Sequence, residues 1–292
     1  MKYVKVLDKN LCPPIQGGEP YEIGVWQHCE NFDTSDNECA PGFYVIPVSE
    51  LIHYHRPWLG TKVLPAEIKG SSRIFTAAKQ RYEYMKLDNP LSDEEIKKLC
   101  KEIEPELGYK LSEALYPVNP LLLPKTAVTD KDIKLLRQWD SVGDSIMDSV
   151  WNSVRNSVGY SVWDSVKNSV GYSVWNSVRN SVRNSVGYSV WNSVRNSVGY
   201  SVGYSVWDSV WNSVWAYIGS LFPSIGKWEY KNHEHSQYPF QSAVNLWYRG
   251  LVPSFDGKIW RLHSGEKAEI VWTEPEIGWL KAQEEEQDEK IQ

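Results

Sequence analysis

The 292-residue sequence is poor in the features that mark exported, membrane-spanning and disulfide-stabilised proteins. It holds 4 cysteines, 3 methionines and 6 phenylalanines, and it has no run of about eighteen apolar residues that would cross a bilayer. Its first residues, Met1-Lys-Tyr-Val-Lys-Val-Leu-Asp-Lys, lack the apolar core of a signal peptide. We therefore expect a cytoplasmic protein with no membrane association and with reduced cysteines.

The sequence also lacks a strong excess of one charge in the segment where it would indicate the kind of ligand. The formal net charge is −6, and residues 281–292 form an acidic tail that carries half of it and that we expect to be disordered. The repeat described next is neutral, with five Asp against five Lys or Arg. This neutrality argues against capture of nucleic acid and equally against mimicry of DNA.

A tetrapeptide, x-[Asp/Asn/Tyr]-Ser-Val, is what the sequence has in excess. It is written nineteen times between Trp139 and Val214, with one lapse at Ile146. The third and fourth positions keep their character, whereas the first position varies among Trp, Gly, Lys, Arg and Met. Positions that tolerate such changes face outward. Ser and Val are therefore the structural positions of the repeat.

An α-helix accommodates this period poorly. Four residues at about 100° each advance about 400°, so the Ser-Val pair drifts about 40° per repeat and forms no fixed apolar face. Val favours extended backbone, and Asn, Asp and Gly favour turns, so one tetrapeptide fits one short side and one corner of a β-solenoid. Val would then point inward, and the Ser hydroxyl would satisfy a backbone group at the corner. Helical hairpins are the alternative.

The number of tetrapeptides per coil stays open. Trp151, Trp163 and Trp175 are spaced by twelve residues, whereas Trp175, Trp191 and Trp207 are spaced by sixteen. The plan resembles that of pentapeptide-repeat proteins, whose coils have four short sides, and this resemblance favours a right-handed quadrilateral coil. The predicted fold class is mainly β: a tetrapeptide-repeat β-solenoid flanked by a small N-terminal α+β domain and a C-terminal aromatic-rich β cap.

Five segments are predicted along the chain. Residues 1–87 read as the small α+β domain, with strands at 3–7, 21–26, 42–48 and 62–68. Residues 88–138 form a helical connector and N-terminal cap, in which Ser92 and Glu95 predict a capping box. The solenoid spans 139–222, a Trp-rich C-terminal cap spans 223–280, and the tail is 281–292. Within the cap, Asp256-Gly257 predicts a hairpin over residues 254–260.

Two groups of side chains have the chemistry of metal ligands. One lies in the N-terminal domain, and the other joins His233, Glu234 and His235 to Asp256 and His263. The sequence has neither C-x-x-C nor H-x-x-x-H, so buried thiols and surface imidazoles are the simpler interpretation, and no metal or cofactor is predicted. The N-terminal candidates are His28, Cys29, Cys39, His53 and His55.

Two stretches are similar to uncharacterised phage and metagenomic proteins that carry x-[DN]-S-V repeats. Cys39-Ala-Pro-Gly42-Phe43-Tyr44 resembles their C-x-x-G-[FL]-H motif, with Tyr44 in the place of the His. The section from Ala216 to His263 resembles the segment that follows their repeats. The resemblance implies a viral or mobile-element lineage and brings no known activity, and chemistry that depends on the missing His is not expected here.

The predicted function is that of a non-enzymatic structural or protein-interaction protein that self-associates. Alternatives are a phage factor that inhibits a host protein, an enzyme with its site in residues 1–87, and a surface that stacks single strands or sugars on its tryptophans. The tryptophans can also simply pack under the terminal segments. The predicted contact surface is the ring and cation set of the repeat, namely Trp151, Trp163, Trp175, Trp191, Trp207, Trp211, Tyr160, Tyr172, Tyr188, Arg155, Arg179 and Arg195.

Overall fold

The computed structural model describes most of the chain and divides it into two compact units. The described residues are 3–14, 18–35, 37, 39–76, 79–142, 145–154, 159–191, 198–229 and 237–274. Unit 1 comprises Met1–Pro117, Asn156–Ser169 and Leu221–Ser224, and unit 2 comprises Val118–Arg155, Val170–Ser220 and Ile225–Gln292. The tetrapeptide repeat therefore contributes to both units.

The prediction of a mainly β solenoid is wrong. Helix accounts for 44% of the described residues and strand for 22%. The repeat adopts the helical alternative, because its described tetrapeptides lie mostly in helices. These are α5 (Ile146–Val154), α6 (Gly159–Val166), the π-helical segment η4 (Lys167–Gly171), α7 (Tyr172–Trp191) and α8 (Val198–Ser220).

The drift of the repeat is tolerated because α5 and α6 are short. Over their nine and eight residues the valines drift by at most about 80°. Val150 and Val154 in α5, and Val162 and Val166 in α6, are all buried. A single stripe of valines therefore suffices for each of these helices.

The π-helical segment reverses the drift where the helix continues. A π turn closes i→i+5 hydrogen bonds and so holds more than four residues, which means that one tetrapeptide advances by less than a full turn. Val166, Val170 and Val174 remain buried on both sides of Lys167–Gly171. The π-helical segment therefore keeps successive valines on the buried face of the helix.

The serine beside each valine is also buried at several repeats, including Ser165, Ser209 and Ser213. Ser209 Oγ donates to Val206 O at 3.1 Å, and Ser213 Oγ donates to Ser209 O at 3.2 Å. These contacts to the preceding turn are those that serine makes inside helices. The hydroxyl thus satisfies a backbone carbonyl, as the sequence predicts, although the backbone is helical.

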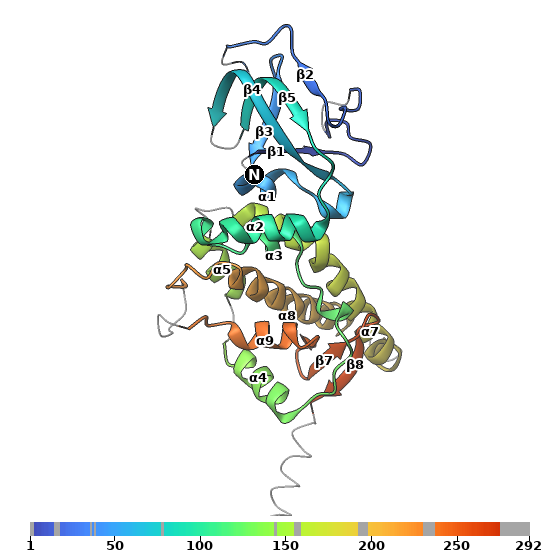
Figure 1. Cartoon of the computed structure of the whole chain (residues 1–292). Helices are drawn as coiled ribbons and strands as arrows, with labels where there is room; N and C mark the ends of the chain where they lie inside the picture. The colour runs from blue at the N-terminus through green and yellow to red at the C-terminus, as the bar shows by residue number, and fades with distance from the viewer. Residues whose placement is uncertain are drawn as a thin grey trace, which may run out of the picture. The chain divides into compact units, whose positions relative to one another are not determined.

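Unit 1 contains an antiparallel sheet that closes on itself. Four strands pair in a circuit, and β2 adds to one edge of β5 (Figure 1). β4 closes the circuit because its residues 62–65 pair with β1 and the rest pair with β5. The predicted strands at 3–7, 42–48 and 62–68 are confirmed, whereas β2 begins where the predicted strand 21–26 ends. The strands are β1 (Tyr3–Leu7), β2 (Trp26–His28), β3 (Phe43–Pro47), β4 (Lys62–Thr76) and β5 (Lys79–Leu87).

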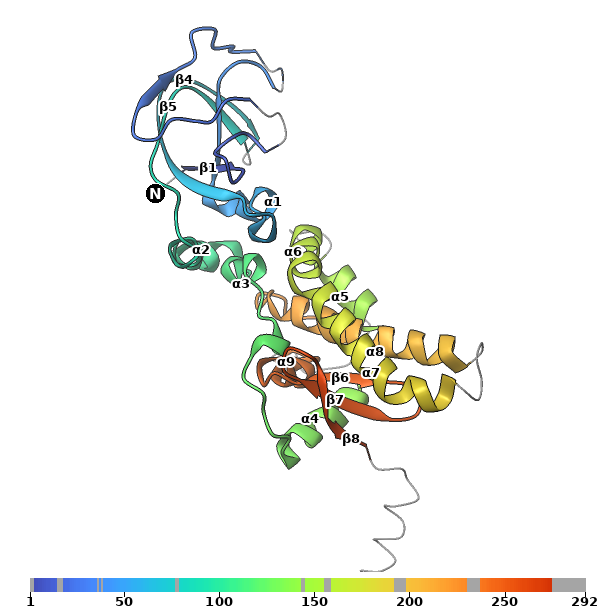
Figure 2. The same ribbon diagram turned by 90° about the vertical axis from the view of Figure 1, so that its right-hand side faces the viewer.

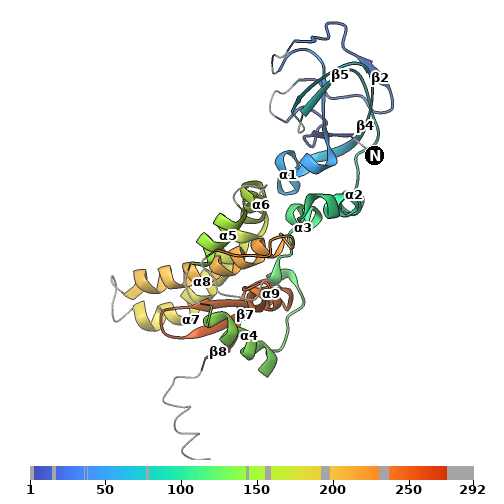
Figure 3. The same ribbon diagram turned by 90° about the vertical axis from the view of Figure 1, so that its left-hand side faces the viewer.

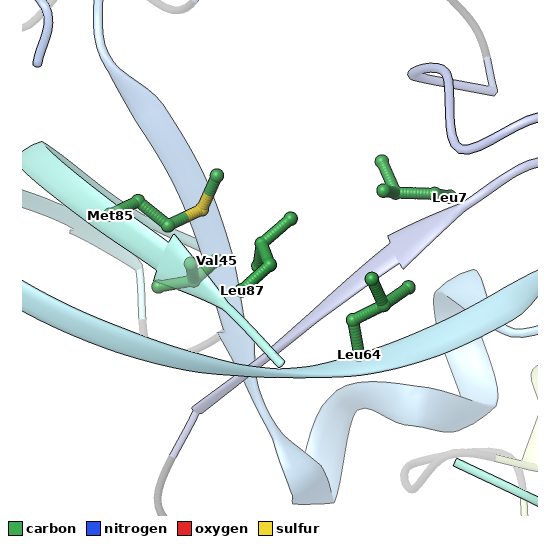
Figure 4. Close-up of a cluster of buried hydrophobic side chains, with 5 residues drawn as sticks. All are labelled: Leu7, Val45, Leu64, Met85 and Leu87. Carbon is green, nitrogen blue, oxygen red and sulfur yellow. The ribbon is translucent and has the colours of Figure 1, made fainter. Parts of the chain in front are cut away.

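Apolar side chains from four strands fill the interior of this sheet. Leu7, Val45, Leu64, Met85 and Leu87 are almost completely buried and face one another (Figure 4). Met85 and Leu87 are two residues apart on β5, so they share one face of the strand. Lys86, which lies between them, therefore faces outward.

Helices complete unit 1. The predicted capping box is confirmed, because the Ser92 hydroxyl accepts the Glu95 N–H and the Glu95 carboxylate accepts the Ser92 N–H. α6 from the repeat contacts α1 and α3 (Figure 2), and Ser165 Oγ donates to Ala114 O at 2.7 Å. The helices of this unit outside the repeat are α1 (Leu51–Tyr54), α2 (Asp93–Leu107) and α3 (Leu111–Leu115).

Unit 2 is built around α8. This helix contacts α5, α7 and α9, and it also contacts the strand β6 (Figure 3). β6, β7 and β8 form a three-stranded antiparallel sheet. Outside the repeat its elements are α4 (Asp130–Asp140), α9 (Gln241–Tyr248), β6 (Val252–Phe255), β7 (Trp260–Ser264) and β8 (Glu269–Thr273).

The predicted hairpin is confirmed at β6 and β7, with a looser turn than expected. Only Gly257 of the Asp-Gly pair has a positive φ, of 94°. The Asp256 carboxylate accepts the backbone N–H groups of Lys258 and Ile259. Because this side chain supplies the turn's hydrogen bonds, the connection holds four residues instead of two.

Among the described helices, none combines the length and the apolar composition that crossing a bilayer requires.

Candidate functional site

Aromatic side chains of the repeat meet where α7 contacts α8. Trp207 lies 4.8 Å from Trp175 and 5.3 Å from Trp211, between ring centroids, and Tyr172 lies 5.7 Å from Trp211. The Arg179 guanidinium lies 5.9 Å from the centre of the Trp175 ring. These five residues are called the α7–α8 aromatic cluster below.

Part of this cluster is open to solvent. Trp175 and Trp211 are buried, whereas Trp207 is 39% exposed and Tyr172 is 42% exposed. Tyr204, one turn before Trp207 on α8, is 65% exposed. Trp175 and Trp211 are thus buried in contact with other rings of the repeat, and the expectation of an exposed aromatic surface holds for Trp207 and Tyr172.

Helix geometry explains this division. If Val marks the centre of the buried face, the following residue lies about 100° to one side and the preceding Ser about 100° to the other. The first position, often Trp, therefore lies at the margin of the buried face. The second position lies nearly opposite Val, and its residues Tyr172 and Tyr204 are exposed accordingly.

The remaining predicted contact residues do not belong to this cluster. Trp151 packs edge-on against Trp215 at 6.4 Å. Tyr160, which is 65% exposed, and Trp163, with the Lys167 ammonium 6.0 Å from its ring centre, belong to unit 1. Arg155 and Arg195, and the side chains of Tyr188 and Trp191, lie outside the described residues.

The structure does not bring the predicted metal ligands together. Within the described ranges, no group of three or more His, Cys, Asp or Glu side chains has the arrangement of a metal site. His28 stacks on Tyr84, and His55 is buried elsewhere in unit 1. Cys29 and Cys39 are free thiols. His233, Glu234 and His235 lie outside the described residues.

His53 is the histidine whose contacts come nearest to those of a catalytic pair. Its Nδ1 lies 2.8 Å from Ser161 Oγ, and its Nε2 lies 3.8 Å from Glu50 Oε2. A serine nucleophile needs a base oriented by a third group within hydrogen-bonding distance, and 3.8 Å exceeds that distance. The contact joins the exposed surfaces of α1 and α6, so its evident role is to dock the repeat helix on α1.

His55 lies within a buried chain of hydrogen bonds. The Tyr116 hydroxyl donates to Asp93 Oδ1 at 3.0 Å, so it accepts from His55 Nε2 at 3.0 Å. Thr61 Oγ1 accepts the Arg56 N–H and donates to His55 Nδ1 at 2.9 Å. The ring therefore carries its proton on Nε2. Burial lowers the pKa of His55 to about 4 and raises that of the Tyr116 hydroxyl.

His263 is the corresponding buried histidine of unit 2. Its Nδ1 donates to Ala268 O at 2.9 Å, and its Nε2 accepts from Ser254 Oγ at 2.8 Å. Burial lowers the pKa of His263 to about 4. Asp256, the other predicted partner, forms an ion pair with Arg261. Both side chains thus hold the β6–β7 hairpin.

We expect acid to destabilise the protein through these two histidines. Each is neutral when folded, with a pKa of about 4, and takes up a proton near pH 6.5 when unfolded. The unfolded state therefore binds more protons as pH falls from 6.5 to 4, and stability present above this window is lost within it. Between pH 7 and pH 5 the expected loss is about 2 kcal/mol per histidine.

Urea unfolding at the two pH values measures this effect. His55→Gln and His263→Gln should each remove about 2 kcal/mol of the pH dependence. Variants that stay as sensitive to pH as the wild type would refute the assignment.

The sequence did not reveal a second exposed aromatic group, which lies on the sheet of unit 1. Trp26 and His28 of β2 lie beside Tyr84 of β5 and Lys69 of β4 on the outward face of three neighbouring strands. The alternation of Trp26 and His28 along one strand was the available signal, since residues two apart share a face. The sequence alone does not show that β2 pairs with β5 or that β5 pairs with β4.

No protein-family model, curated protein or solved structure matches this chain. The contacts and exposures described above are therefore the basis for assigning a function.

Proposed function

We propose that the protein is a non-enzymatic interaction protein that self-associates through the α7–α8 aromatic cluster. The observation that carries this proposal is the position of Trp207, which contacts two buried tryptophans and yet is 39% exposed. A rigid aromatic side chain at the edge of a packed cluster loses little conformational freedom on binding, and such side chains dominate protein interfaces.

A second copy of the chain suits the apolar and nearly neutral character of this surface. A twofold interface brings one patch against the same patch, so an apolar, nearly neutral patch is self-complementary. Arg179 lies beside the Trp175 ring, and the exposed Asp208, which follows Trp207 in the sequence, carries the opposite charge. Two copies related by a twofold axis can therefore pair unlike charges around the aromatic centre.

Substituting Trp207 by Ser is expected to weaken self-association about thirtyfold. The loss corresponds to the 2 kcal/mol or so that a central interface Trp contributes. The measurement is the absolute mass from size-exclusion chromatography with light scattering, at two concentrations and two salt levels. The wild type should exceed the 33.6 kDa of one chain and remain associated at high salt, because the contact is apolar.

Tyr160→Ser is the matched control, since Tyr160 is another aromatic residue of the repeat and is 65% exposed, but lies in unit 1. It should leave the mass unchanged. A wild-type monomer of 33.6 kDa at both concentrations would contradict self-association. The aromatic cluster would then have a foreign protein as its partner.

The cytoplasm is the compartment that we propose for this activity. All four cysteines lie among the described residues and are free thiols, as a reducing compartment keeps them. Cys100 is buried, and burial raises its pKa to about 12, so this thiol is unreactive. Accumulation of the protein with oxidised cysteines in its native host would contradict this placement.

A further inference from the structure

The outward face formed by β2, β5 and β4 carries rings and charges in two rows across the strands. Trp26, Lys86 and Glu67 form one row in the register of the sheet. His28, Tyr84 and Lys69 form the other row. These six residues are called the β2–β5–β4 face below.

The rings of this face are stacked and partly exposed. The His28 and Tyr84 rings are nearly parallel, at 11°, with centroids 4.3 Å apart. The Lys69 ammonium lies 4.0 Å from the centre of the Trp26 indole and 5.3 Å from that of the Tyr84 ring. Trp26 is 41% exposed, and the side chain of His28 is 42% exposed. The face thus offers two ring surfaces to a ligand beside one cation.

The backbone holds these rings in place before any ligand binds. β4 changes register between Lys69 and Ser72. Gly70 lies in this irregularity with a φ of +80°, and a Cβ there would lie 2.7 Å from Tyr84 Cδ2. The Tyr84 ring therefore rests directly on the glycine backbone. Glu83 accepts the Ser71 N–H at 2.9 Å and contacts His28 Nε2 at 3.3 Å, so the His28 ring is fixed as well.

The position of Lys69 on the face suits an anionic group of a ligand. Glu67 forms an ion pair with Lys86 at 3.1 Å, and Glu83 is used by Ser71 and His28. The Lys69 ammonium has no carboxylate partner in the described part of the chain and contacts ring faces only. Lys69 is thus the cation of this face that lies against exposed rings and can contact an anionic group of a ligand.

We propose that the β2–β5–β4 face binds single-stranded nucleic acid, with bases stacked on Trp26 and His28 and a phosphate on Lys69. Stacking of bases on aromatic side chains, next to cations that contact the backbone, is how sequence-tolerant single-strand binding works. Paired bases in a duplex present no free ring faces, so a duplex does not fit this surface. The site lies in unit 1 and is independent of the proposed self-association through unit 2.

The overall neutrality of the chain is compatible with this site. Residues 1–87 contain ten Lys or Arg and ten Asp or Glu. Electrostatic capture over many phosphates is therefore excluded, and stacking must carry the affinity. If Lys69 contacts one phosphate, the logarithm of the binding constant should fall with the logarithm of the salt concentration with a slope of only about −0.7.

Fluorescence anisotropy of labelled oligothymidine and oligouridine, titrated with the full chain, tests the proposal. Trp26→Ala should weaken binding by about five- to a hundredfold, the loss expected for one stacked base. Lys69→Gln should flatten the salt dependence. Far-UV circular dichroism checks that each variant is folded. Trp207→Ser should bind as the wild type does, which separates this site from self-association.

Trp58→Ala is the matched control, because Trp58 is a partly exposed ring in unit 1 whose centre lies 5.6 Å from the Arg56 guanidinium. It should bind the oligonucleotides normally. The proposal is overturned if the wild type binds no single strand, if Trp26→Ala binds as well as wild type, or if a duplex binds equally. Quenching of tryptophan fluorescence by a neutral oligosaccharide, with none by oligothymidine, would assign the face to sugars instead.

Discussion

Replacing Arg81 by Met is expected to lower the unfolding free energy of unit 1 by about 3–5 kcal/mol, because several hydrogen bonds from one charged donor are lost at about 1 kcal/mol or more each. The Arg81 side chain is fully buried. Its guanidinium donates to the carbonyl oxygens of Asp33, Ser35 and Asn37 and to the Tyr44 hydroxyl, at 2.5–3.1 Å. Without it, these partly buried acceptors lose the donor that holds them together.

Tyr44 is also part of this network. The Tyr44 hydroxyl donates to Ala40 O at 2.8 Å and accepts from Arg81, so it helps to close the loop before β3. Gly42 lies directly against the Arg81 stem, and a Cβ there would be 2.4 Å from Arg81 Cγ. Residues 39–44 therefore help to enclose the Arg81 side chain.

Urea unfolding, combined with hydrogen exchange over residues 29–44, measures the effect. Arg81→Lys should recover little of the lost unfolding free energy, because a single ammonium group cannot reach all the acceptors that the planar guanidinium of Arg81 contacts. Lys86→Met is the matched control on the same strand. It breaks an exposed ion pair with Glu67 and should cost less than about 1 kcal/mol. Equal losses from the two strand positions would contradict the proposed role of Arg81.

Inserting Asn-Ser between Val206 and Trp207 is expected to disrupt the packing of α8, whereas inserting Gly-Tyr-Ser-Val at the same point should largely preserve it. Two added residues rotate the preceding part of the helix by about 200°, and four rotate it by about 40°. The shorter insertion turns buried Val206 outward and exposed Tyr204 inward. Exposing Val206 alone costs about 1.5–3 kcal/mol, and the contacts of Trp207 are lost in addition.

The longer insertion lengthens α8 by about 6 Å, yet it repeats the same side chains. Because valine and its neighbours recur every four residues, α7 can dock one repeat further along α8. Near-UV circular dichroism of the tryptophans and thermal unfolding by far-UV circular dichroism distinguish the two variants. If both insertions abolish the near-UV signal to the same extent, the helical phase of the repeat does not determine its packing.

Several local features could be predicted because they depend on neighbouring residues. The capping box of Ser92 and Glu95 is confirmed, as is the hairpin of β6 and β7, since both depend on a few consecutive side chains. The type of the hairpin turn was wrong because Asp256 uses its carboxylate as an acceptor for the turn's own backbone. Of the candidate surface, Trp207 and Tyr172 were predicted as exposed and are so. Trp175 and Trp211 are buried because α7 and α8 lie against each other.

The sequence by itself determined that the Val position of the tetrapeptide is buried in the helices, because Val faces inward in a solenoid and in a helix alike, whereas Ser is buried in only some of the described repeats. It did not determine the backbone conformation. A four-residue period fits one side of a β coil and is also within half a residue of one α-helical turn. The valine position rotates around the helix from repeat to repeat, and this rotation matters more the longer the helix packs against one neighbouring element. Only the tertiary structure sets that length. The β2–β5–β4 face likewise exists only after folding, because it joins residues from strands that are distant in the chain.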